Sequence, residues 1–418
     1  MSRVMTERRV VVTGRGVLGP LGHDWPTVQA WLKTGRNAVR HFPEWGQYKG
    51  LNSRLGVPAQ PFELPEHYTR KATRSMGRVA LLATRASELA LADAGLLGDP
   101  LLKSGKVGIS YGSSAGTPSS MSDFGRMLAE FNTQYINATT YIRMMAHTAP
   151  VNMGVFFGIT GRIVTTSSAC TSGSQGIGYA YEAIRAGKQV AMLAGGSEEL
   201  DVTATTVFDT LFATSSDNDA PETTPRPFDV SRNGLVIGEG GCTLVLEDLE
   251  HALARGATIH AEIVGYGTNS DGQHVTQPNA ATMAQAMRLA LDDAGLSPDA
   301  IAYVNAHGTA TEHGDIAETT ATHAVFGERM PISSLKSFTG HTLGTCGAME
   351  AWVTLEMLRE GWFHPTANLR NVDPRCGHLD YILPTEQGGG RLIDGEYAMS
   401  NNFAFGGINT SLVLRRWS

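Results

Sequence analysis

The sequence has few cysteines, no long apolar run and no excess of positive charge, and each of these absences excludes a class of protein. Four cysteines in 418 residues, none spaced as Cys-x-x-Cys, argue against a disulfide-stabilised secreted domain. No apolar stretch reaches the roughly eighteen residues that a membrane-spanning helix needs. With 33 Lys and Arg against 40 Asp and Glu, the net charge of −7 does not suit a nucleic-acid binder. The opening residues, MSRVMTERRVVVTG, lack a signal-peptide pattern, so we expect a cytoplasmic protein that binds neither membrane nor nucleic acid.

Two stretches 200 residues apart are nearly identical. They are Ala90-Leu-Ala-Asp-Ala-Gly-Leu96 and Ala290-Leu-Asp-Asp-Ala-Gly-Leu296, and both end an apolar helical pattern at a glycine. A β-type run closed by Gly-x-Gly precedes each of them, and a short apolar run leading into a small-residue loop follows each. One such heptapeptide can arise by chance, but three elements in the same order indicate a duplicated α/β unit.

We therefore predict an α/β protein built from two related halves, residues 1–255 and 256–418. With 42% hydrophobic residues the chain can bury a large core. The first half carries about 50 extra residues between Trp25 and Tyr68, which we expect to form an insertion over the site. The Gly14-x-Gly16 pattern is not a dinucleotide fingerprint, because the third glycine and the later acidic residue are missing.

Cys170 lies where a β-type run, beginning at Arg162, turns into a glycine-rich helical pattern. Unpaired N–H groups at a helix N-terminus favour thiolate over thiol, so this position predicts a reactive cysteine. A free cysteine is often only an inert buried residue. The strand–cysteine–helix setting and the small flanking residues favour the nucleophile.

Two histidines, His307 and His341, each follow a short predicted strand and precede small residues. A single histidine in such a place is more often structural. Two of them, both in the half without the nucleophile, indicate a shared site, because the strand ends of a duplicated α/β fold converge on one pocket. His313 and His323 are expected on polar surface.

The motifs TSSACTSGSQGIG, VNAHGTATEHGD, SSLKSFTGHTLGTCGAMEA and NNFAFGGIN closely resemble those of the β-ketoacyl–acyl-carrier-protein synthases, of the elongating kind with a Cys/His/His triad. The resemblance runs from RRVVVTG near the start to FAFGGINTSLVL near the end. It implies a thiolase-type fold, which is a five-layered αβαβα body made from two duplicated halves, and a homodimer.

The resemblance also implies a role for each matching residue. Cys170 would be the acylated nucleophile, and His307 and His341 would handle malonyl decarboxylation. Lys336 matches a supporting lysine, and Glu350 matches the carboxylate that would pair with it and leave the histidines neutral. The other implied positions are the N–H groups of Cys170 and Phe405 (oxyanion hole), Phe405 (gate), Thr309 and Thr311 (phosphopantetheine), Phe208 and Phe403 (acyl pocket), and Lys71 and Arg74 (carrier docking).

These roles imply a decarboxylative Claisen condensation between an acyl thioester and malonyl-acyl-carrier protein, which gives a β-ketoacyl carrier. No metal or redox cofactor is expected, since the phosphopantetheine arrives on the carrier. The expected partners are an acyl carrier protein and a second copy of the chain, or a related ketosynthase in a heterodimer. The basic residues Lys71 and Arg74 could equally form a solvated helix face.

The chain departs from the family pattern at several positions. Ala404 replaces the first glycine of a Gly-Phe-Gly-Gly loop, which should stiffen the gate. Phe212 stands where an arginine is common, Ser75 where a third basic residue is common, and Asn233 where an aspartate is. The LFATS and NNFAFGGIN segments look similar to synthases of aryl-polyene clusters. Phe208 and Phe212, at helical spacing, could line a pocket for a flat chain or be ordinary core or dimer contacts.

Three related classes fit the sequence less well. A degradative thiolase needs a second catalytic cysteine, and Cys346 and Cys376 lie in other motifs. An initiating synthase would have asparagine where His341 stands, and a non-catalytic chain-length partner would lack Cys170. The alternative assignment is a non-elongating thiolase-like acyltransferase or a partner subunit of a heterodimeric ketosynthase.

Overall fold

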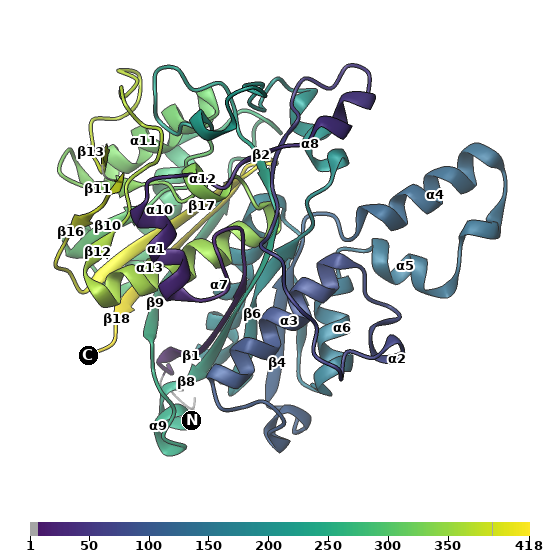
Figure 1. Ribbon diagram of the computed structural model, residues 1–418. Helices are drawn as coiled ribbons and strands as arrows, with labels where there is room; N and C mark the ends of the chain where they lie inside the picture. The colour runs from purple at the N-terminus through teal and green to yellow at the C-terminus, as the bar shows by residue number, and fades with distance from the viewer. Residues whose placement is uncertain (1–6, 387) are drawn as a thin grey trace.

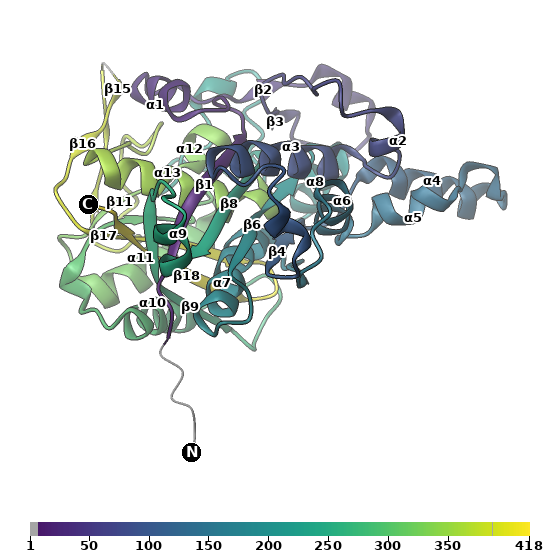
Figure 2. The same ribbon diagram turned by 90° about the horizontal axis from the view of Figure 1, so that it is seen from below.

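The computed structural model describes residues 7–386 and 388–418, and a large mixed sheet with helices on its faces forms its centre (Figures 1 and 2). Eleven strands run in the order β13-β11-β10-β17-β18-β9-β1-β8-β6-β4-β5. The first half supplies β1 (Val10–Leu18), β4 (Val107–Gly112), β5 (Ile163–Thr165), β6 (Ala191–Glu198) and β8 (Gly240–Asp248). The second supplies β9 (Ala261–Ser270), β10 (Ile301–Asn305), β11 (Pro331–Ser333), β13 (Asp380–Tyr381), β17 (Tyr397–Ala404) and β18 (Ile408–Arg416).

The two halves repeat one strand pattern. In the first, β4 is parallel to both β5 and β6, β6 is antiparallel to β8, and β8 is antiparallel to β1. In the second, β10 is parallel to both β11 and β17, β17 is antiparallel to β18, and β18 is antiparallel to β9. The halves join where β1 and β9 pair, with Val10 opposite Ile263. The boundary proposed at residues 255/256 falls between α9 (Leu249–Ala254) and β9.

The two Gly-x-Gly pairs, expected to close their strands, lie within β1 and β9 and have one purpose in both halves. A Cβ on Gly14 would lie 2.2 Å from the carbonyl oxygen of Ala90, and a Cβ on Gly265 would lie 2.3 Å from that of Ala290. Each glycine therefore lets a helix lie directly on a strand, α3 (Arg78–Asp93) on β1 and α10 (Ala280–Ala294) on β9. This contact explains the repeated Gly-x-Gly pattern without a dinucleotide.

Helices form three layers around the two halves of the sheet. The outer layers contain α3 and α10, and the inner layer contains α7 (Ser172–Arg185) and α13 (Cys346–Glu360), which pack on each other. Close approach of the inner pair needs small residues, because a Cβ on Gly173 would lie 2.9 Å from the backbone nitrogen of Ala348. The expected five-layered αβαβα body is confirmed.

The insertion does not lie over the site, and this expectation was wrong. The insertion contains α1 (Trp25–Lys33), β2 (Arg40–His41) and β3 (Leu55–Val57), and α2 (Arg70–Thr73) follows it directly. The apolar face of α1 is buried against α13, where the ring of Trp25 meets that of Trp352 edge-on at 6.1 Å. β3 pairs with β7 (Ile237–Gly238), a strand beside the catalytic pocket. The insertion therefore supports the site from behind, because its apolar residues must face the core.

Other elements complete the fold. No helix within the described part of the chain is both long and apolar enough to span a bilayer. An arm protrudes from the body, visible at the right of Figure 1, and consists of α4 (Pro118–Glu130) and α5 (Ala138–Met144). The remaining helices and strands are α6 (Thr148–Phe157), α8 (Val202–Asp209), α11 (Glu312–Phe326), α12 (Lys336–Thr339), β12 (Trp362–Phe363), β14 (Pro384–Thr385), β15 (Gly388–Gly389) and β16 (Arg391–Leu392).

Candidate active site

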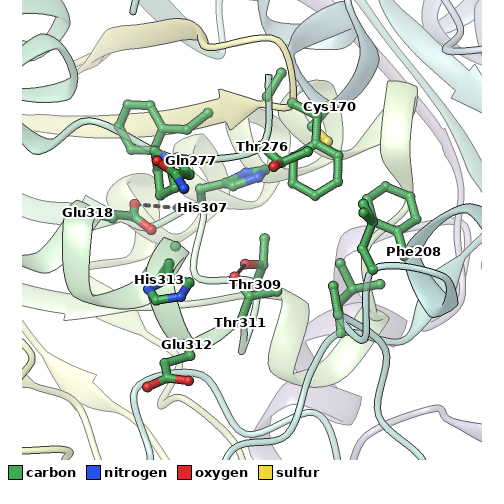
Figure 3. A pocket seen from close by; sticks show the side chains of 18 of the residues that line it. Cys170, Phe208, Thr276, Gln277, His307, Thr309, Thr311, Glu312, His313 and Glu318 are labelled. Atoms are coloured by element: carbon green, nitrogen blue, oxygen red, sulfur yellow. Dashed lines mark hydrogen bonds between the residues drawn. The ribbon is translucent and has the colours of Figure 1, made fainter. Parts of the chain in front are cut away.

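A pocket of about 490 Å³ lies between the two halves, and residues from both line it (Figure 3). Cys170 comes from the first half, and His307 and His341 come from the second. The sulfur of Cys170 and a ring nitrogen of each histidine all lie within 4.8 Å of one another. The structure therefore brings together the three residues that the sequence predicted as a triad.

Cys170 sits on a tight turn between strand and helix. Ala169, before it, has a left-handed backbone with φ of 50°, a strained conformation that non-glycine residues adopt mainly at functional sites. The short 3-10 helix Ala169–Thr171 leads directly into α7. The second half repeats this turn before α13, where Leu343 has φ of 46° and Gly344 stands in the place of the cysteine.

His341 is held so that it donates a hydrogen bond to the nucleophile. Its Nε2 lies 3.0 Å from Sγ of Cys170, and the backbone N–H of Leu343 donates to its Nδ1 at 3.1 Å. Because Nδ1 accepts this bond, the neutral ring carries its proton on Nε2. The backbone of His341 is fixed as well: its N–H donates to the carbonyl of Val236, just before β7, and its carbonyl accepts from the N–H of Gly238, in β7.

His307 has the same tautomer for a different reason. Nζ of Lys336 lies 3.0 Å from its Nδ1, and an ammonium group can only donate. Lys336 in turn contacts the Glu350 carboxylate, whose other oxygen accepts a 2.6 Å bond from Asn402. The carboxylate of Glu318 accepts the N–H groups of His307 and Gly308, both at 2.7 Å, as Figure 3 shows for His307. Both rings therefore keep their Nε2 protons for a ligand or for Cys170.

Electrostatics keep both histidines neutral. Burial lowers the pKa of His307 and of His341 well below the ordinary range, and the charge of Lys336 lowers both further. Burial opposes the charge of Lys336, but the neighbouring Cys346 and Glu350 raise its pKa above the ordinary value. The site thus contains one fixed cation and two neutral hydrogen-bond donors.

The thiol of Cys170 is not a resting thiolate, contrary to the expectation from its place at a helix N-terminus. Burial raises its pKa to about 11, although the charge of Lys336 and the backbone N–H groups of Phe405 and Cys170 act in the opposite direction. Cys170 is only 3% exposed, so the loss of hydration outweighs the local dipole. Its deprotonation must therefore accompany attack on a thioester.

The other residues that the resemblance assigned to the acyl pocket and the phosphopantetheine arm also line this pocket. The rings of Phe208 and Phe405 lie 5.1 Å apart beside the nucleophile, and the rings of Phe403 and His307 lie nearly perpendicular to each other at 6.2 Å. Further from Cys170, the hydroxyl groups of Thr309 and Thr311 share a 2.8 Å hydrogen bond (Figure 3). The exposed His313 lines the same pocket, which its expected place on polar surface did not indicate.

Three predicted residues lie outside the interior of the pocket. Phe212 does not continue helix α8, which ends at Asp209; it has a left-handed backbone with φ of 54° and stands at the rim of the pocket, 87% exposed. Lys71 and Arg74 are exposed in and beside α2, and neither lines the pocket. Within residues 7–386 and 388–418, neither forms an ion pair.

Sequence reasoning missed two buried groups of the site. Glu318 lies in α11, where a glutamate among polar residues looks like an ordinary surface position, and burial raises its pKa to about 8. Asn402 lies in the NNFAFGGIN motif, but only the fold shows that it bonds to Glu350. Glu318 accepts the backbone N–H of His307, and the two residues are eleven positions apart in the sequence. This short separation is the signal that could have pointed to Glu318.

The spacing of Cys170, His307 and His341 also resembles that of metal ligands. However, Nδ1 of each ring accepts a hydrogen bond, which leaves the proton on Nε2. A nitrogen that carries a proton offers no lone pair to a metal ion. In this hydrogen-bonding state the arrangement suits donation to an oxygen anion instead.

Comparisons with known proteins agree with this geometry. The family models described as "Beta-ketoacyl synthase, N-terminal domain" and "Beta-ketoacyl synthase, C-terminal domain" match residues 7–252 and 260–370. A 3-oxoacyl-[acyl-carrier-protein] synthase 1 from Haemophilus influenzae is 36% identical over 98% of this chain and all of the relative. A solved beta-ketoacyl synthase from Burkholderia phymatum STM815 is 59% identical, with a TM-score of 0.96 over 98% of this chain and 100% of the other. A type II PKS ketosynthase solved in complex with its acyl-carrier protein is 30% identical, with a TM-score of 0.85 over 99% of this chain and 100% of the other. The chain therefore belongs to the β-ketoacyl synthase family and has its thiolase-type fold.

Proposed function

We propose that the protein condenses a Cys170-bound acyl group with malonyl-acyl-carrier protein, with loss of CO2, to give a β-ketoacyl carrier. The observation that carries the proposal is the convergence of one thiol and two neutral Nε2–H donors in a single pocket, with Nε2 of His341 3.0 Å from Sγ of Cys170. A nucleophile beside two fixed donors suits acyl transfer followed by stabilisation of an enolate. The family and the carrier complex of a relative support the same reaction.

The first step transfers the acyl group to Cys170. Sγ attacks the thioester carbonyl of the acyl carrier, the carbon–sulfur bond to the phosphopantetheine breaks, and the thiol proton ends on the departing phosphopantetheine thiol. The backbone N–H groups of Cys170 and Phe405, which lower the pKa of the thiol in the resting enzyme, would hold the tetrahedral oxyanion. The hydroxyl groups of Thr309 and Thr311 would contact the incoming phosphopantetheine arm.

The second step uses the histidines. The malonyl carbon–carbon bond breaks, CO2 leaves, and its electron pair forms an enolate next to the carrier thioester. The Nε2–H groups of His307 and His341 donate to that enolate oxygen, and their neutrality keeps them as donors without a proton transfer. The enolate carbon then attacks the Cys170 thioester, the bond between the acyl carbon and the Cys170 sulfur breaks, and the sulfur takes up one proton from water, which restores the thiol.

Incubation with an acyl carrier and malonyl-carrier, followed by mass spectrometry, tests the proposal. The expected product is a β-ketoacyl carrier two carbons longer than the primer. Cys170→Ala should give no product. If the wild-type protein acylates Cys170 but never elongates the chain, the alternative of a non-elongating acyltransferase or partner subunit is correct instead.

We further propose that the primer is flat and conjugated, as in aryl-polyene chains. The Phe208–Phe405 pair beside Cys170 supports this, because aromatic contacts add about 0.5–1.5 kcal/mol beyond area burial. Ala404, at the end of β17 before the gate residue, would restrict the motion of Phe405 more than glycine. Competition between an aryl-polyenoyl carrier and a saturated C8 carrier, measured as the ratio of their kcat/KM values, tests this proposal. A higher kcat/KM for the saturated chain would indicate fatty-acid elongation.

We propose that the working form is a dimer, with a second copy or a related ketosynthase. β5 lies at one edge of the sheet and exposes 43% of Ile163. The arm exposes Leu128 (69%), Phe131 (95%) and Tyr141 (51%), an area of apolar surface that a partner would cover. Sedimentation of the pure protein should show a dimer, and Ile163→Asp should weaken it. A monomer that retains full activity would contradict the proposal.

We propose that Lys71 and Arg74 attract the acidic carrier, since the chain as a whole carries a charge of −7 and would repel it. Reversing both charges should raise KM for carrier-bound substrates at low salt and leave small thioesters unaffected. Lys188→Glu is the matched control, because Lys188 is exposed just beyond the end of α7 that is remote from Cys170. Equal effects on both substrate types would mean that this helix face is only structural.

We also propose a cytoplasmic location, which the four free cysteines support.

A further inference from the structure

One buried carboxylate near the pocket has no role in the steps described above. Glu198 is the last residue of β6 and is 3% exposed. One of its oxygens, Oε2, accepts the backbone N–H of Ser114 at 2.7 Å and that of Gly344 at 2.9 Å. We propose that Glu198 is a positioning residue for His341, because it holds the turn whose N–H fixes the tautomer of that ring. This inference rests on the function proposed above and extends the role of His341 in it.

The turn between His341 and α13 is strained and depends on support from outside. Leu343 has φ of 46°, a left-handed conformation that a bulky residue keeps only where its surroundings enforce it. Its N–H donates to Nδ1 of His341 at 3.1 Å, and the next N–H, that of Gly344, donates to Glu198. The φ of Leu343 sets the angle between these two planar peptide groups. The strained conformation therefore directs one N–H at the ring and the other at the carboxylate, so the two bonds support each other.

Glu198 and its neighbours pack directly on this turn. A Cβ on Gly344 would lie 2.8 Å from Oε2 of Glu198 and 2.9 Å from the backbone nitrogen of Ser114. A Cβ on Gly196, two residues earlier in β6, would lie 2.0 Å from the carbonyl oxygen of Gly344. β6 and the segment after β4 thus fix the position of the carboxylate relative to the turn. A shorter side chain at position 198 would leave the N–H of Gly344 without this acceptor.

The carboxylate is held by hydrogen bonds and not by a counter-charge. In the part of the chain that the structure describes, Glu198 forms no ion pair, and its donors are the N–H groups of Ser114, Ala115 and Gly344 and the hydroxyl of Ser114. Burial raises the pKa of Glu198, and these donors oppose that rise. Burying an unpaired carboxylate is unfavourable, whereas a neutral amide could fill the same space. A charge-assisted bond is about twice as strong as a neutral one, which suits the support of a strained turn.

The repeated architecture supports this role. In the first half, the N–H of Cys170 in the equivalent turn is one of the two groups proposed to hold the substrate oxyanion. In the second half Gly344 takes that place, and its N–H meets the carboxylate of Glu198. One turn therefore serves a substrate anion, and the other holds an anion that the protein itself supplies. The second turn is the one that directs His341 at Cys170.

The tautomer of His341 is the first measurement, and it requires no turnover. Two-bond ¹H–¹⁵N correlation spectra of histidine-labelled protein show which ring nitrogen carries the proton, and the signal lost in His341→Ala identifies the residue. The wild-type ring should carry its proton on Nε2. In Glu198→Ala the proton should be shared between Nε2 and Nδ1, because Nδ1 loses a fixed donor. Glu262→Ala is the matched control, because Glu262 is 4% exposed but bonds to Arg9 and Arg415 and does not line the pocket.

Decarboxylation of malonyl-carrier separates positioning from a general loss of structure. Glu198→Ala should lower the rate of CO2 release about tenfold, the effect of losing one hydrogen bond. In a His307→Ala background the same factor should appear, because His341 is still present and still needs support. In a His341→Ala background the factor should disappear, because no ring is left to position.

An equal factor in both backgrounds, no effect in either, or a wild-type ring protonated on Nδ1 overturns the inference. If Glu198→Ala does not fold, Glu198→Gln allows the same comparison with a smaller factor of about threefold, because a neutral amide oxygen accepts more weakly. Failure of the proposed condensation would appear separately, as a wild-type protein that releases no CO2, while the spectra would still show whether Glu198 fixes the ring of His341.

Discussion

Replacing Lys336 with methionine should separate two roles that this residue combines. Its ammonium group fixes the tautomer of His307 at 3.0 Å and neutralises Glu350. Without the ammonium, the His307 proton can move to Nδ1 and the pocket loses one donor. We expect decarboxylation of malonyl-carrier to fall by about 10²–10³, the usual effect of removing one oxyanion donor. Acyl transfer to Cys170 should change much less.

The same substitution also leaves a carboxylate unpaired in the core. The side chains of Lys336 and Glu350 are 1% and 2% exposed, so removing one partner should reduce the free energy of unfolding by about 3–5 kcal/mol. Because the pKa of Lys336 is raised, the lysine is charged throughout the neutral range. Burial raises the pKa of Glu350 and Lys336 opposes that rise, so without the lysine the carboxyl takes up a proton more readily, and the loss of stability should shrink as the pH falls.

A double variant distinguishes tautomer from charge. In Lys336→Met/Glu350→Gln the unpaired charge is gone, so most of the lost stability in urea denaturation should return. Decarboxylation, followed as CO2 release, should stay low, because the other donor near Nδ1 of His307, the amide of Asn402, lies 3.4 Å away and is neutral, so it fixes the tautomer less strongly than the ammonium at 3.0 Å. If the double variant regains both stability and decarboxylation, Lys336 acts only by balancing the charge of Glu350, and the tautomer argument is wrong. A single variant that decarboxylates at the wild-type rate would also refute it.

Three further predictions concern the triad. Incubation with an acyl thioester should add one acyl group per chain, on Cys170, as seen by intact mass. An adduct on Cys346 or Cys376 would refute the assignment. The variant Cys170→Ala should still decarboxylate malonyl-carrier. His307→Ala and His341→Ala should each lower decarboxylation by about 10²–10³ and acyl transfer by less, and wild-type rates in both would show the roles to be wrong. Because the pKa of Cys170 is raised to about 11, the thiolate fraction below that value grows with pH. Alkylation by iodoacetamide should therefore accelerate about tenfold per unit between about pH 7 and pH 9.5, whereas a plateau near pH 8 would mean that the helix dipole prevails over burial.

Local signals explain why much of the fold could be predicted. The apolar helical pattern expected to end at Gly95 is α3, Arg78–Asp93, and Gly95 after it has φ of 67°. Glycine and apolar spacing are properties of neighbouring residues, so they can be read along the chain. The same holds for Cys170, which the structure also places between a strand and a helix.

What could not be predicted depends on contacts between distant segments. Helix α8 ends before Phe212 because Asp209 bonds to Ser53, 156 residues away, and no spacing rule contains that contact. The pKa of Cys170 depends on how deeply both halves bury it, while its place at a helix N-terminus is visible in the sequence. The insertion was misplaced for the same reason, since its partner α13 lies in the other half.

The second strained turn, before α13, makes the two halves unequal despite their common strand pattern. Gly344 occupies the place of the cysteine, and its N–H donates to Glu198 at 2.9 Å. A Cβ there would lie 2.8 Å from the Glu198 carboxylate and 2.9 Å from Cα of Ser113, so no side chain fits. A chimera made of two first halves would lack the histidines, and one made of two second halves would lack the thiol. The repeated architecture thus permits a single working orientation, in which one repeat carries the acyl cargo and the other manages the carbanion.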